Sequence, residues 1–251
     1  MSHHVVEVRN LGYAYPDGTE ALKGVSFRIE HGLAVALVGA NGAGKSTLLQ
    51  HLNGTLMPTT RGEVVIGGTT LTRETAATVR RAVGMVFQDP DDQLFMPTVF
   101  EDVAFGPLNA GLPPAEAEER AATALERVGM GHLRNRPPYK LSAGEKRAVA
   151  IATALAMSPD VLVMDEPSSN LDPRGRRRLI GLLRSFEHTR IIATHDLELV
   201  VEVCSHVFVL DGGALVAEGP TLAVLNDEAL MLAHGLECPH ILHHLHPHGP
   251  A

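Results

Sequence analysis

A glycine-rich segment near residue 40 has the residue types needed to hold a phosphate. Residues 39–46 read GANGAGKS and fit the pattern G-x-x-x-x-G-K-[ST]. The glycines matter because the backbone amides of such a loop must turn toward one phosphate, in conformations that a Cβ would obstruct. Lys45 could reach the β- and γ-phosphates of a nucleotide, and Ser46 could hold Mg²⁺. We expect the following residues to contact the nucleotide: Gly39, Asn41, Gly42, Gly44, Lys45, Ser46 and Thr47.

Two adjacent carboxylates follow a second apolar run. Residues 161–167 read VLVMDEP, so Asp165 and Glu166 stand at the carboxyl end of a predicted parallel strand, where ligands bind in open α/β folds. Asp165 suits a Mg²⁺ shell, and Glu166 is placed to orient or deprotonate an attacking water. Alone, a strand that ends in Asp-Glu is more often a solvated terminus than a site. Together with the lysine loop, it indicates a nucleoside triphosphatase.

These residues require a sheet that presents several strand ends to one ligand. Residues 33–38 form a continuous apolar run, typical of a strand covered on both faces, and lead directly into the glycine-rich loop. A turn signal at 15–18 separates two β-rich runs and predicts an antiparallel sheet. Strands and helices then alternate, which predicts an α/β fold with a mainly parallel sheet. The expected strands are 5–8, 21–29, 33–38, 63–66, 83–87, 161–164, 191–193 and 207–210, and the expected helices begin near 45 or span 174–186 and 197–203.

The composition changes between about residues 89 and 158. Several prolines punctuate this stretch, and residues 115–128 repeat Ala, Leu, Glu and Arg at helical spacing, with Gly129 at a C-cap position. We therefore predict a helical subdomain inserted over residues 89–158.

Length and charge exclude several classes of protein. The 251 residues are 45% hydrophobic, enough for a substantial core. The longest apolar stretch, 148–157, is far shorter than the roughly 20 residues of a membrane-spanning helix, so we expect a chain that does not cross a membrane alone. The N-terminus lacks the pattern of a signal peptide, and the cytosol is the default compartment. A formal charge of −8 with 4% aromatic residues disfavours nucleic acid as a partner.

Cysteine and histidine usage points to one unusual segment. Cys204 and Cys238 are too few for a disulfide scaffold and are interpreted as free thiols. Residues 236–251 carry five histidines among Pro and Gly, which predicts a flexible His-rich tail. Imidazoles bind nickel, cobalt and zinc well, but the tail could equally be solvated sequence with adventitious metal affinity.

A further segment indicates which family of nucleoside triphosphatases the chain resembles. Residues 141–147 read LSAGEKR and resemble the signature sequence of ATP-binding-cassette (ABC) ATPases, usually written L-S-G-G-Q. The resemblance implies that Ser142 and the Gly144 amide meet the γ-phosphate held by a second subunit. The same residues could also form only a capping box, in which Ser142 and Glu145 satisfy each other's backbone amides. Ala143 and Glu145 depart from the usual Gly and Gln.

Other motifs occur in the order typical of that family, across roughly residues 5–225. Tyr15 resembles the aromatic that stacks on adenine, with Tyr13 a near alternative, and Gln88 resembles the loop glutamine that links metal and water to the transport partner. Residues 169–172 resemble the loop that couples paired subunits, and His195 resembles the switch histidine at the γ-phosphate. The resemblance implies a P-loop NTPase (RecA-like) core, an antiparallel β subdomain and the inserted helices, together one ABC domain over residues 1–235. It also implies ATP and Mg²⁺ as cofactors, with Ser46, Gln88 and Asp165 at the metal and Lys45, Gln88, Glu166 and His195 in catalysis.

Three further segments are similar to the energy-coupling-factor branch, especially its cobalt and nickel importers. They are YAYPDGTEAL at 13–22, FQDPDDQLF at 87–95 and SSNLDP at 168–173. The resemblance implies a dimer with itself or a paralogous ATPase at the cytoplasmic face of the membrane, beneath a transmembrane coupling protein and a substrate-binding membrane subunit. Leu94, Phe95 and Met96 are candidate contacts for the coupling protein, although they could simply pack in the core of the insert.

Three other functions compete with this interpretation. The same kind of ATPase could drive import of a vitamin or another small solute, because the cargo is chosen by a membrane subunit. A second alternative is a non-transport cassette, such as a clamp in DNA repair or translation. Such proteins usually carry coiled-coil insertions or two cassettes, and this sequence, with its acidic balance, shows neither. A small-molecule kinase would use the lysine loop but would not explain residues 142–145 or His195.

Overall fold

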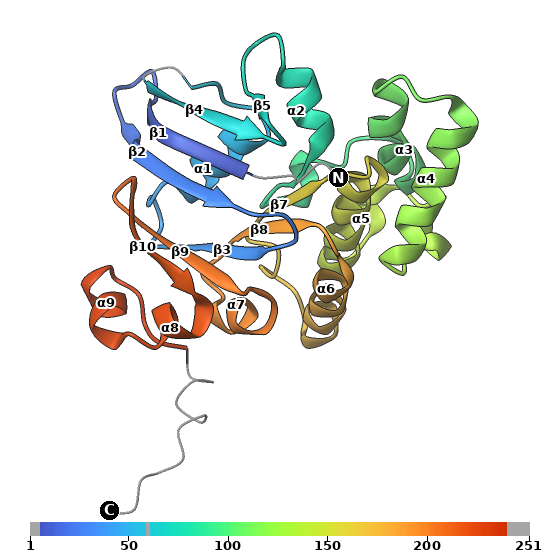
Figure 1. The fold of residues 1–251 in the computed structure, drawn as a ribbon. Coiled ribbons are helices and arrows are strands. Elements are labelled where there is room, and N and C mark those ends of the chain that lie inside the picture. The colour runs from blue at the N-terminus through green and yellow to red at the C-terminus, as the bar shows by residue number, and fades with distance from the viewer. Residues whose placement is uncertain (1–5, 59–60, 240–251) are drawn as a thin grey trace, which may run out of the picture.

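The computed structural model describes residues 6–58 and 61–239. Two sheets are stacked in the main body, and a group of helices lies to one side (Figure 1). The six-stranded sheet has the order β10-β9-β3-β8-β7-β6, and the four-stranded sheet has the order β2-β1-β4-β5. The strands are β1 (Val6–Ala14), β2 (Glu20–Ile29), β3 (Ala34–Val38), β4 (Arg61–Ile66), β5 (Thr69–Thr70), β6 (Val83–Val86), β7 (Val161–Asp165), β8 (Thr189–Ala193), β9 (His206–Asp211) and β10 (Ala214–Pro220).

The large sheet is parallel except at one edge. Strands β6, β7, β8, β3 and β9 pair in parallel, and β10 joins β9 through a hairpin and runs antiparallel to it. Strands β3 and β7 are buried along their whole length, as the continuous apolar runs predicted. The expected mainly parallel sheet is therefore confirmed, and the carboxyl ends of its parallel strands meet at one edge.

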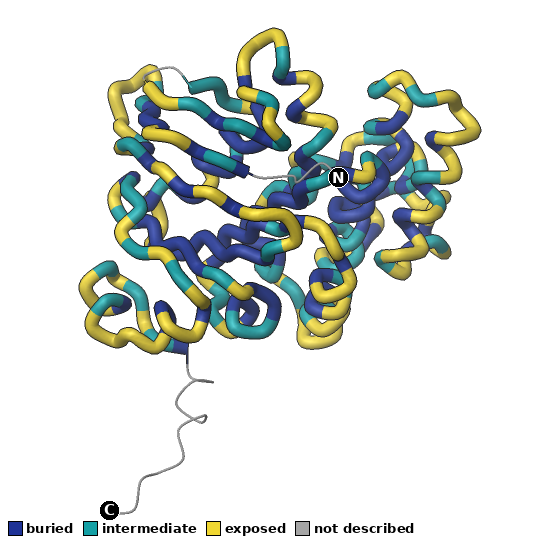
Figure 2. Tube along the Cα trace, viewed as in Figure 1, coloured by how far each residue is buried: buried dark blue, intermediate teal, exposed yellow. Residues whose placement is uncertain are grey.

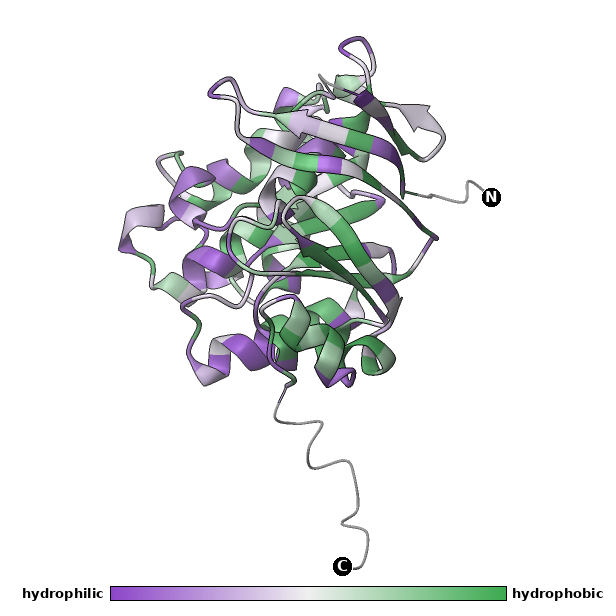
Figure 3. Ribbon diagram, turned by 90° about the vertical axis from the view of Figure 1, so that its left-hand side faces the viewer, coloured by the Kyte–Doolittle hydropathy of each residue, from purple (hydrophilic) through white to green (hydrophobic). Residues whose placement is uncertain are grey.

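The two faces of this sheet belong to different hydrophobic cores. In β3, Val35 and Leu37 pack with the small sheet and α1, whereas Ala36 and Val38 pack with the helices on the other face. This alternation follows from the pleat, which sends successive side chains to opposite faces. Figure 2 shows the resulting buried layer through the centre, and Figure 3 shows hydrophobic colour concentrated on these strands.

The small sheet is the predicted antiparallel unit. Strands β1 and β2 pair antiparallel, with Val6 opposite Ile29 and Val8 opposite Phe27. Strand β1 extends to Ala14 and is longer than the predicted run of 5–8. Its pairing with β2 becomes irregular after Val8, which accommodates the polar residues Arg9 and Asn10 within the strand.

Helices surround the large sheet and form the insert. Helices α3, α4 and α5 pack on one another within the predicted range 89–158, beside the main body (Figure 1). In α4 every fully buried residue is Ala or Leu on one side, which matches the periodicity that predicted the helix. The helices are α1 (Lys45–Leu52), α2 (Ala76–Ala82), α3 (Val99–Asn109), α4 (Pro114–Arg127), α5 (Ala143–Ala156), α6 (Pro173–Ser185), α7 (Leu197–Val203), α8 (Thr221–Leu225) and α9 (Glu228–Ala233).

The segment after α9 corrects one predicted boundary. Leu236 and Cys238 pack against the main core and Pro239 is buried, so residues 236–239 belong to the folded body and not to a tail. The apolar character of these residues outweighs the polar composition of the segment around them. The remainder of the predicted His-rich tail, residues 240–251, lies outside the described residues. Both cysteines are free thiols, as expected. Across residues 6–58 and 61–239, no helix combines the length and apolarity needed to span a bilayer.

Candidate nucleotide-binding site

The glycine-rich loop joins β3 to α1, as predicted. A Cβ on Gly39 would collide with the carbonyl oxygen of Leu210 at the end of β9. Gly44 has φ +101°, and a Cβ there would lie 2.6 Å from the carbonyl oxygen of Ala21. These two positions therefore need glycine, and the loop is held between the large sheet and the start of β2.

Lys45 is the first residue of α1, and its side chain folds back over the loop. Its Nζ donates hydrogen bonds to the carbonyl oxygens of Gly39, at 2.7 Å, and Ala40, at 3.1 Å. Burial lowers the pKa of Lys45, while the negative charges of Glu166 and Asp165 oppose this shift. The ammonium group is thus held over the loop near two carboxylates, where a phosphate bound by the loop amides could accept hydrogen bonds from it.

The two carboxylates lie at the end of β7 and are buried. Asp165 and Glu166 are each 6% exposed. Burial raises the pKa of Asp165; a hydrogen bond from the Ser46 hydroxyl opposes the shift and the charge of Glu166 adds to it. Glu166 has φ +46°, a left-handed conformation that is uncommon for residues other than glycine and costs about 1–3 kcal/mol. This strained backbone turns the Glu166 side chain away from the direction that a continued strand would give it.

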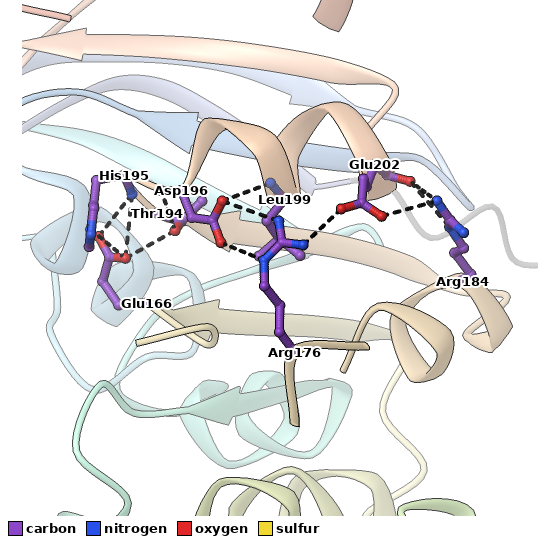
Figure 4. A network of polar contacts seen from close by, with 8 residues as sticks. All are labelled: Glu166, Arg176, Arg184, Thr194, His195, Asp196, Leu199 and Glu202. Carbon is purple, nitrogen blue, oxygen red and sulfur yellow. Dashed lines mark hydrogen bonds and ion pairs between the residues drawn. The ribbon is translucent and has the colours of Figure 1, made fainter. Parts of the chain in front are cut away.

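The Glu166 carboxylate is held by the segment after β8 (Figure 4). It accepts hydrogen bonds from the Thr194 hydroxyl, at 3.0 Å, and from the backbone amide of His195, at 3.1 Å. The ring Nδ1 of His195 lies 2.9 Å from Glu166 Oε2, although 71% of the His195 side chain is exposed. Two residues predicted from separate motifs are therefore in direct contact, with one face of the imidazole still open.

Thr194 was not predicted, and it provides a direct test of how Glu166 is held. Thr194→Val should lower turnover about tenfold, because one buried hydrogen bond to the carboxylate is lost while the shape is kept. Thr189→Val is the matched control, since Thr189 begins β8, the strand that Thr194 follows, and is equally buried, at 0% exposed. Steady-state ATP hydrolysis and thermal melting of both variants separate the two effects. Equal turnover in the two variants would contradict a positioning role for Thr194.

A cavity of about 860 Å³ gathers the predicted nucleotide residues. Tyr15 lines it, and its hydroxyl lies 2.9 Å from Thr47 Oγ1. Tyr13 is 8% exposed and packs edge-on against Tyr15 and His51, so it lies in the core. The cavity lining also includes Thr19, Glu20, Ala21, Gly39, Ala40, Asn41, Gly42, Gly44, Lys45, Ser46, Gln88, Asp165, Glu166, His195, Gly235 and Leu236. Residues from six separate stretches of the chain, 15–21, 39–47, 88, 165–166, 195 and 235–236, thus converge on one space of the size that ligands occupy.

The signature segment lies elsewhere. Ser142 and Gly144 line a separate cavity of about 850 Å³ together with residues at the start of α6. Ser142 accepts a hydrogen bond from the Glu145 amide, and the Glu145 carboxylate accepts one from the Ser142 amide at 2.8 Å, so the capping box is present. Neither Ser142 nor Gly144 lines the nucleotide cavity of its own chain.

Comparisons with known proteins give the family. The family model described as ABC transporter matches residues 22–169. A putative ABC transporter ATP-binding protein of Geobacter sulfurreducens is 64% identical over 239 residues, which cover 95% of this chain and 96% of that protein. The chain belongs to the ABC transporter ATP-binding family. It is an ABC-type ATPase, and its α/β cassette fold is the one predicted from the motifs.

Two further matches indicate which ABC proteins this chain resembles. The energy-coupling factor transporter ATP-binding protein EcfA of Methanothermobacter thermautotrophicus is 48% identical, covering 94% of this chain and 77% of that protein. Among solved structures, cbiO1 of Clostridium perfringens, part of the ABC transporter complex cbiONQ, has a TM-score of 0.80 at 39% identity. That alignment covers 97% of this cassette and 99% of cbiO1.

The cassette also contains a link between the signature helix and the Gln88 loop that the sequence did not indicate. Arg147 in α5 is 3% exposed and donates to the carbonyl oxygens of Phe87 and Gln88, both at 2.7 Å. Gln93 accepts from the Phe87 amide and donates to Thr153 in α5 at 2.6 Å. No local pattern singles out these two residues, because each acts through a partner about 60 residues away.

A second network, also missed, fixes the segment after His195. Arg176 in α6 forms ion pairs with Asp196, at 3.3 Å, and with Glu202, at 2.9 Å (Figure 4). Asp196 also caps α7 by accepting from the Leu199 amide at 2.8 Å. Asp196 is therefore held both by Arg176 and by the start of α7, which limits movement of the backbone at the neighbouring His195.

Proposed function

We propose that this cassette is the ATP-hydrolysing subunit of a membrane importer of the energy-coupling-factor type, with cobalt or nickel ions as cargo. The observation that carries the proposal is the convergence of Lys45, Asp165, Glu166 and His195 on one cavity. The similarity to EcfA and to cbiO1 supports the branch. The cargo rests on the resemblance of residues 13–22, 87–95 and 168–173 to the cobalt and nickel importers.

Each converging residue has a distinct part in hydrolysis. Glu166 is the general base, because its buried carboxylate is held by Thr194 and His195 at the cavity wall and can accept a proton from an attacking water. Lys45 and the loop amides stabilise the negative charge of the phosphates. The exposed face of His195 is free to contact the γ-phosphate. Tyr15 offers its ring to the base, since it lines the cavity and Tyr13 does not.

The residues present fit a magnesium ion. The Ser46 hydroxyl bonds to the Asp165 carboxylate, and Gln88 shares with them a neighbouring groove of about 600 Å³. Hydroxyl, carboxylate and amide oxygens are the ligands that Mg²⁺ prefers. A bound Mg²⁺ would neutralise charge on the phosphates and favour the ionised form of Asp165 against the effect of its burial.

Two cassettes acting together would complete the site. Ser142 and Gly144 lie at the N-terminus of α5 and outside the chain's own nucleotide cavity. We therefore place them against the nucleotide of a second copy or of a paralogous ATPase, where the helix N-terminus would meet the γ-phosphate. Ala143 stands between Ser142 and Gly144, so its methyl group would lie close to the nucleotide of the second copy.

The surface for a membrane partner lies on the helical insert. Leu94 is 7% exposed and packs in the core, so the alternative of plain core packing holds for this residue. Phe95 is 64% exposed and meets Phe105 edge-on, with ring centroids 5.0 Å apart. The buried Asp102 carboxylate accepts hydrogen bonds from the amides of Phe95 and Met96 and so holds this loop in place. An exposed aromatic pair, formed by Phe95 on this fixed loop and Phe105 on α3, suits contact with an apolar helix of a coupling protein at the cytoplasmic face of the membrane.

Replacing Phe95 tests this surface. Phe95→Ser should abolish transport by the assembled complex and leave ATP hydrolysis by the isolated cassette within about twofold, because Phe95 lies outside the nucleotide cavity. Tyr139→Ser is the matched control, since Tyr139 is 75% exposed elsewhere on the insert. Co-purification with the membrane subunits would show which step is lost. Full transport by Phe95→Ser would remove Phe95 from the interface.

Uptake of labelled cobalt and nickel tests the cargo. Cells that express the cassette with its neighbouring membrane genes should accumulate one of these metals, and Glu166→Gln should abolish the accumulation. If neither metal enters while ATP hydrolysis is intact, the cargo is wrong and import of a vitamin or another small solute is the second candidate. The similarity to EcfA, whose name specifies no cargo, favours keeping that candidate.

A further inference from the structure

The nucleotide cavity has one wall that none of the recognised motifs supplies. Gly235 and Leu236 follow α9 near the C-terminal end of the described chain and line the same cavity as Tyr15, Lys45 and His195. The other lining residues come from the turn between β1 and β2, the start of β2, the glycine-rich loop, the first turn of α1 and the segments at the carboxyl ends of β6, β7 and β8.

The backbone after α9 fixes the position of Leu236. The Leu236 amide donates to the carbonyl oxygen of Met231 at 2.9 Å, and the Gly235 amide donates to that of Leu232 at 3.2 Å. Gly235 has φ +69°, so the helix ends in a Schellman motif with glycine in the left-handed position. Met231 is fully buried, and the partly buried Leu236 packs against the same core. This is the hydrophobic contact that commonly accompanies the motif.

A second contact ties this segment to the phosphate loop. The ring Nδ1 of His234 lies 2.9 Å from Asp211 Oδ2 at the end of β9. The preceding residue, Leu210, presents its carbonyl oxygen to Gly39, and Gly213 donates to the carbonyl oxygen of Ala43 at 3.2 Å. Helices α8 and α9 lie beside β9 and β10, as Figure 1 shows. The segment is therefore anchored to the strand that borders the phosphate loop.

We propose that Leu236 is a nucleotide-contacting residue, held against bound ATP by the Schellman motif and by the His234–Asp211 pair. The aliphatic side chains that line the cavity are Ala21, Ala40 and Leu236, and Leu236 is the largest of them. An aliphatic group at this wall displaces water from the bound nucleotide, which strengthens the attraction between the phosphates and Lys45. The proposal rests on the assignment of ATP to this cavity.

The test is equilibrium binding of a non-hydrolysable ATP analogue to the full-length chain. Leu236→Ala should weaken binding about 3- to 10-fold, the loss expected when a few methyl and methylene groups leave a contact. Leu232→Ala is the matched control, because Leu232 lies four residues earlier on α9 and is 61% exposed outside the cavity. It should bind the analogue as the wild type does.

His234→Ala provides an independent variant that keeps Leu236 itself. It removes the contact with Asp211 and should weaken binding in the same direction, with a smaller effect than Leu236→Ala. Melting temperatures without nucleotide identify any general loss of folding, which would lower the melting temperature without changing the affinity of the folded fraction.

The outcomes separate failure of the Leu236 proposal from failure of the assignment of ATP to this cavity. If Leu236→Ala binds like the wild type while Lys45→Ala binds more weakly, Leu236 does not touch the nucleotide and the proposal fails. If Lys45→Ala also binds like the wild type, the assignment of the whole cavity fails. Weaker binding by Leu236→Ala, together with normal binding by Leu232→Ala, would show that Leu236 contacts the nucleotide.

Discussion

Glu166→Gln is expected to bind ATP normally and to lower hydrolysis about 100- to 10,000-fold, the usual contribution of a general base. Glutamine keeps the size of the side chain and an oxygen that can accept from Thr194 and His195, but it cannot accept a proton from water. Because ATP then persists, the paired cassettes should accumulate in the closed, nucleotide-bound dimer. Single-turnover hydrolysis and gel filtration with ATP measure the two effects.

Glu198→Gln is the control for this substitution. Glu198 lies in the first turn of α7, three residues after His195, and is exposed to solvent. Its replacement removes the same charge from the same region and should leave turnover unchanged. A Glu166→Gln variant with wild-type turnover would remove Glu166 from the role of base and would leave water activation to another group.

Lys45→Ala is expected to weaken ATP binding about 10- to 100-fold and to abolish measurable hydrolysis. The range corresponds to about 1.5–3 kcal/mol for a hydrogen bond to a charged group. The increase in melting temperature that ATP produces in the wild type should shrink or disappear in the variant.

The control for Lys45→Ala is Lys140→Ala. Lys140 is exposed at the end of a short turn near Tyr139 and lies outside the nucleotide cavity. Its variant should show the full ATP-dependent increase in melting temperature. An equal increase in Lys45→Ala would contradict the assignment of the glycine-rich loop to phosphate.

Much of the core of this cassette could be predicted from the sequence, because the informative residues are contiguous. The loop at 39–46, the strand that leads into Asp165 and Glu166, and the capping residues Ser142 and Glu145 are each contained in a short contiguous segment. Alternation of apolar runs and amphipathic segments likewise predicted the parallel sheet, because strand and helix periodicity are local properties. The family motifs then predicted which of these segments share one site.

Packing decided between residues that the sequence could not separate. Tyr13 lies in β1, whereas Tyr15 follows the end of that strand at Ala14, after an irregular pairing between Tyr13 and Ala14. Tyr15 therefore lines the cavity, and Tyr13 packs in the core. Leu94 and Phe95 are equally apolar neighbours, yet one is buried and the other exposed. Local composition cannot predict these differences, because each depends on where a distant helix or strand covers the chain.

Tertiary structure alone assembled the supporting contacts. Thr194 and Arg176 hold the catalytic segment, and Arg147 holds the Gln88 loop, through partners 20 to 60 residues away in the chain. Leu236 reaches the nucleotide cavity from the opposite end of the sequence to Tyr15. The sequence by itself determined the chemistry of this ATPase, since the reacting groups occur in short motifs. The tertiary structure decided which side chains position those groups, because that depends on long-range packing.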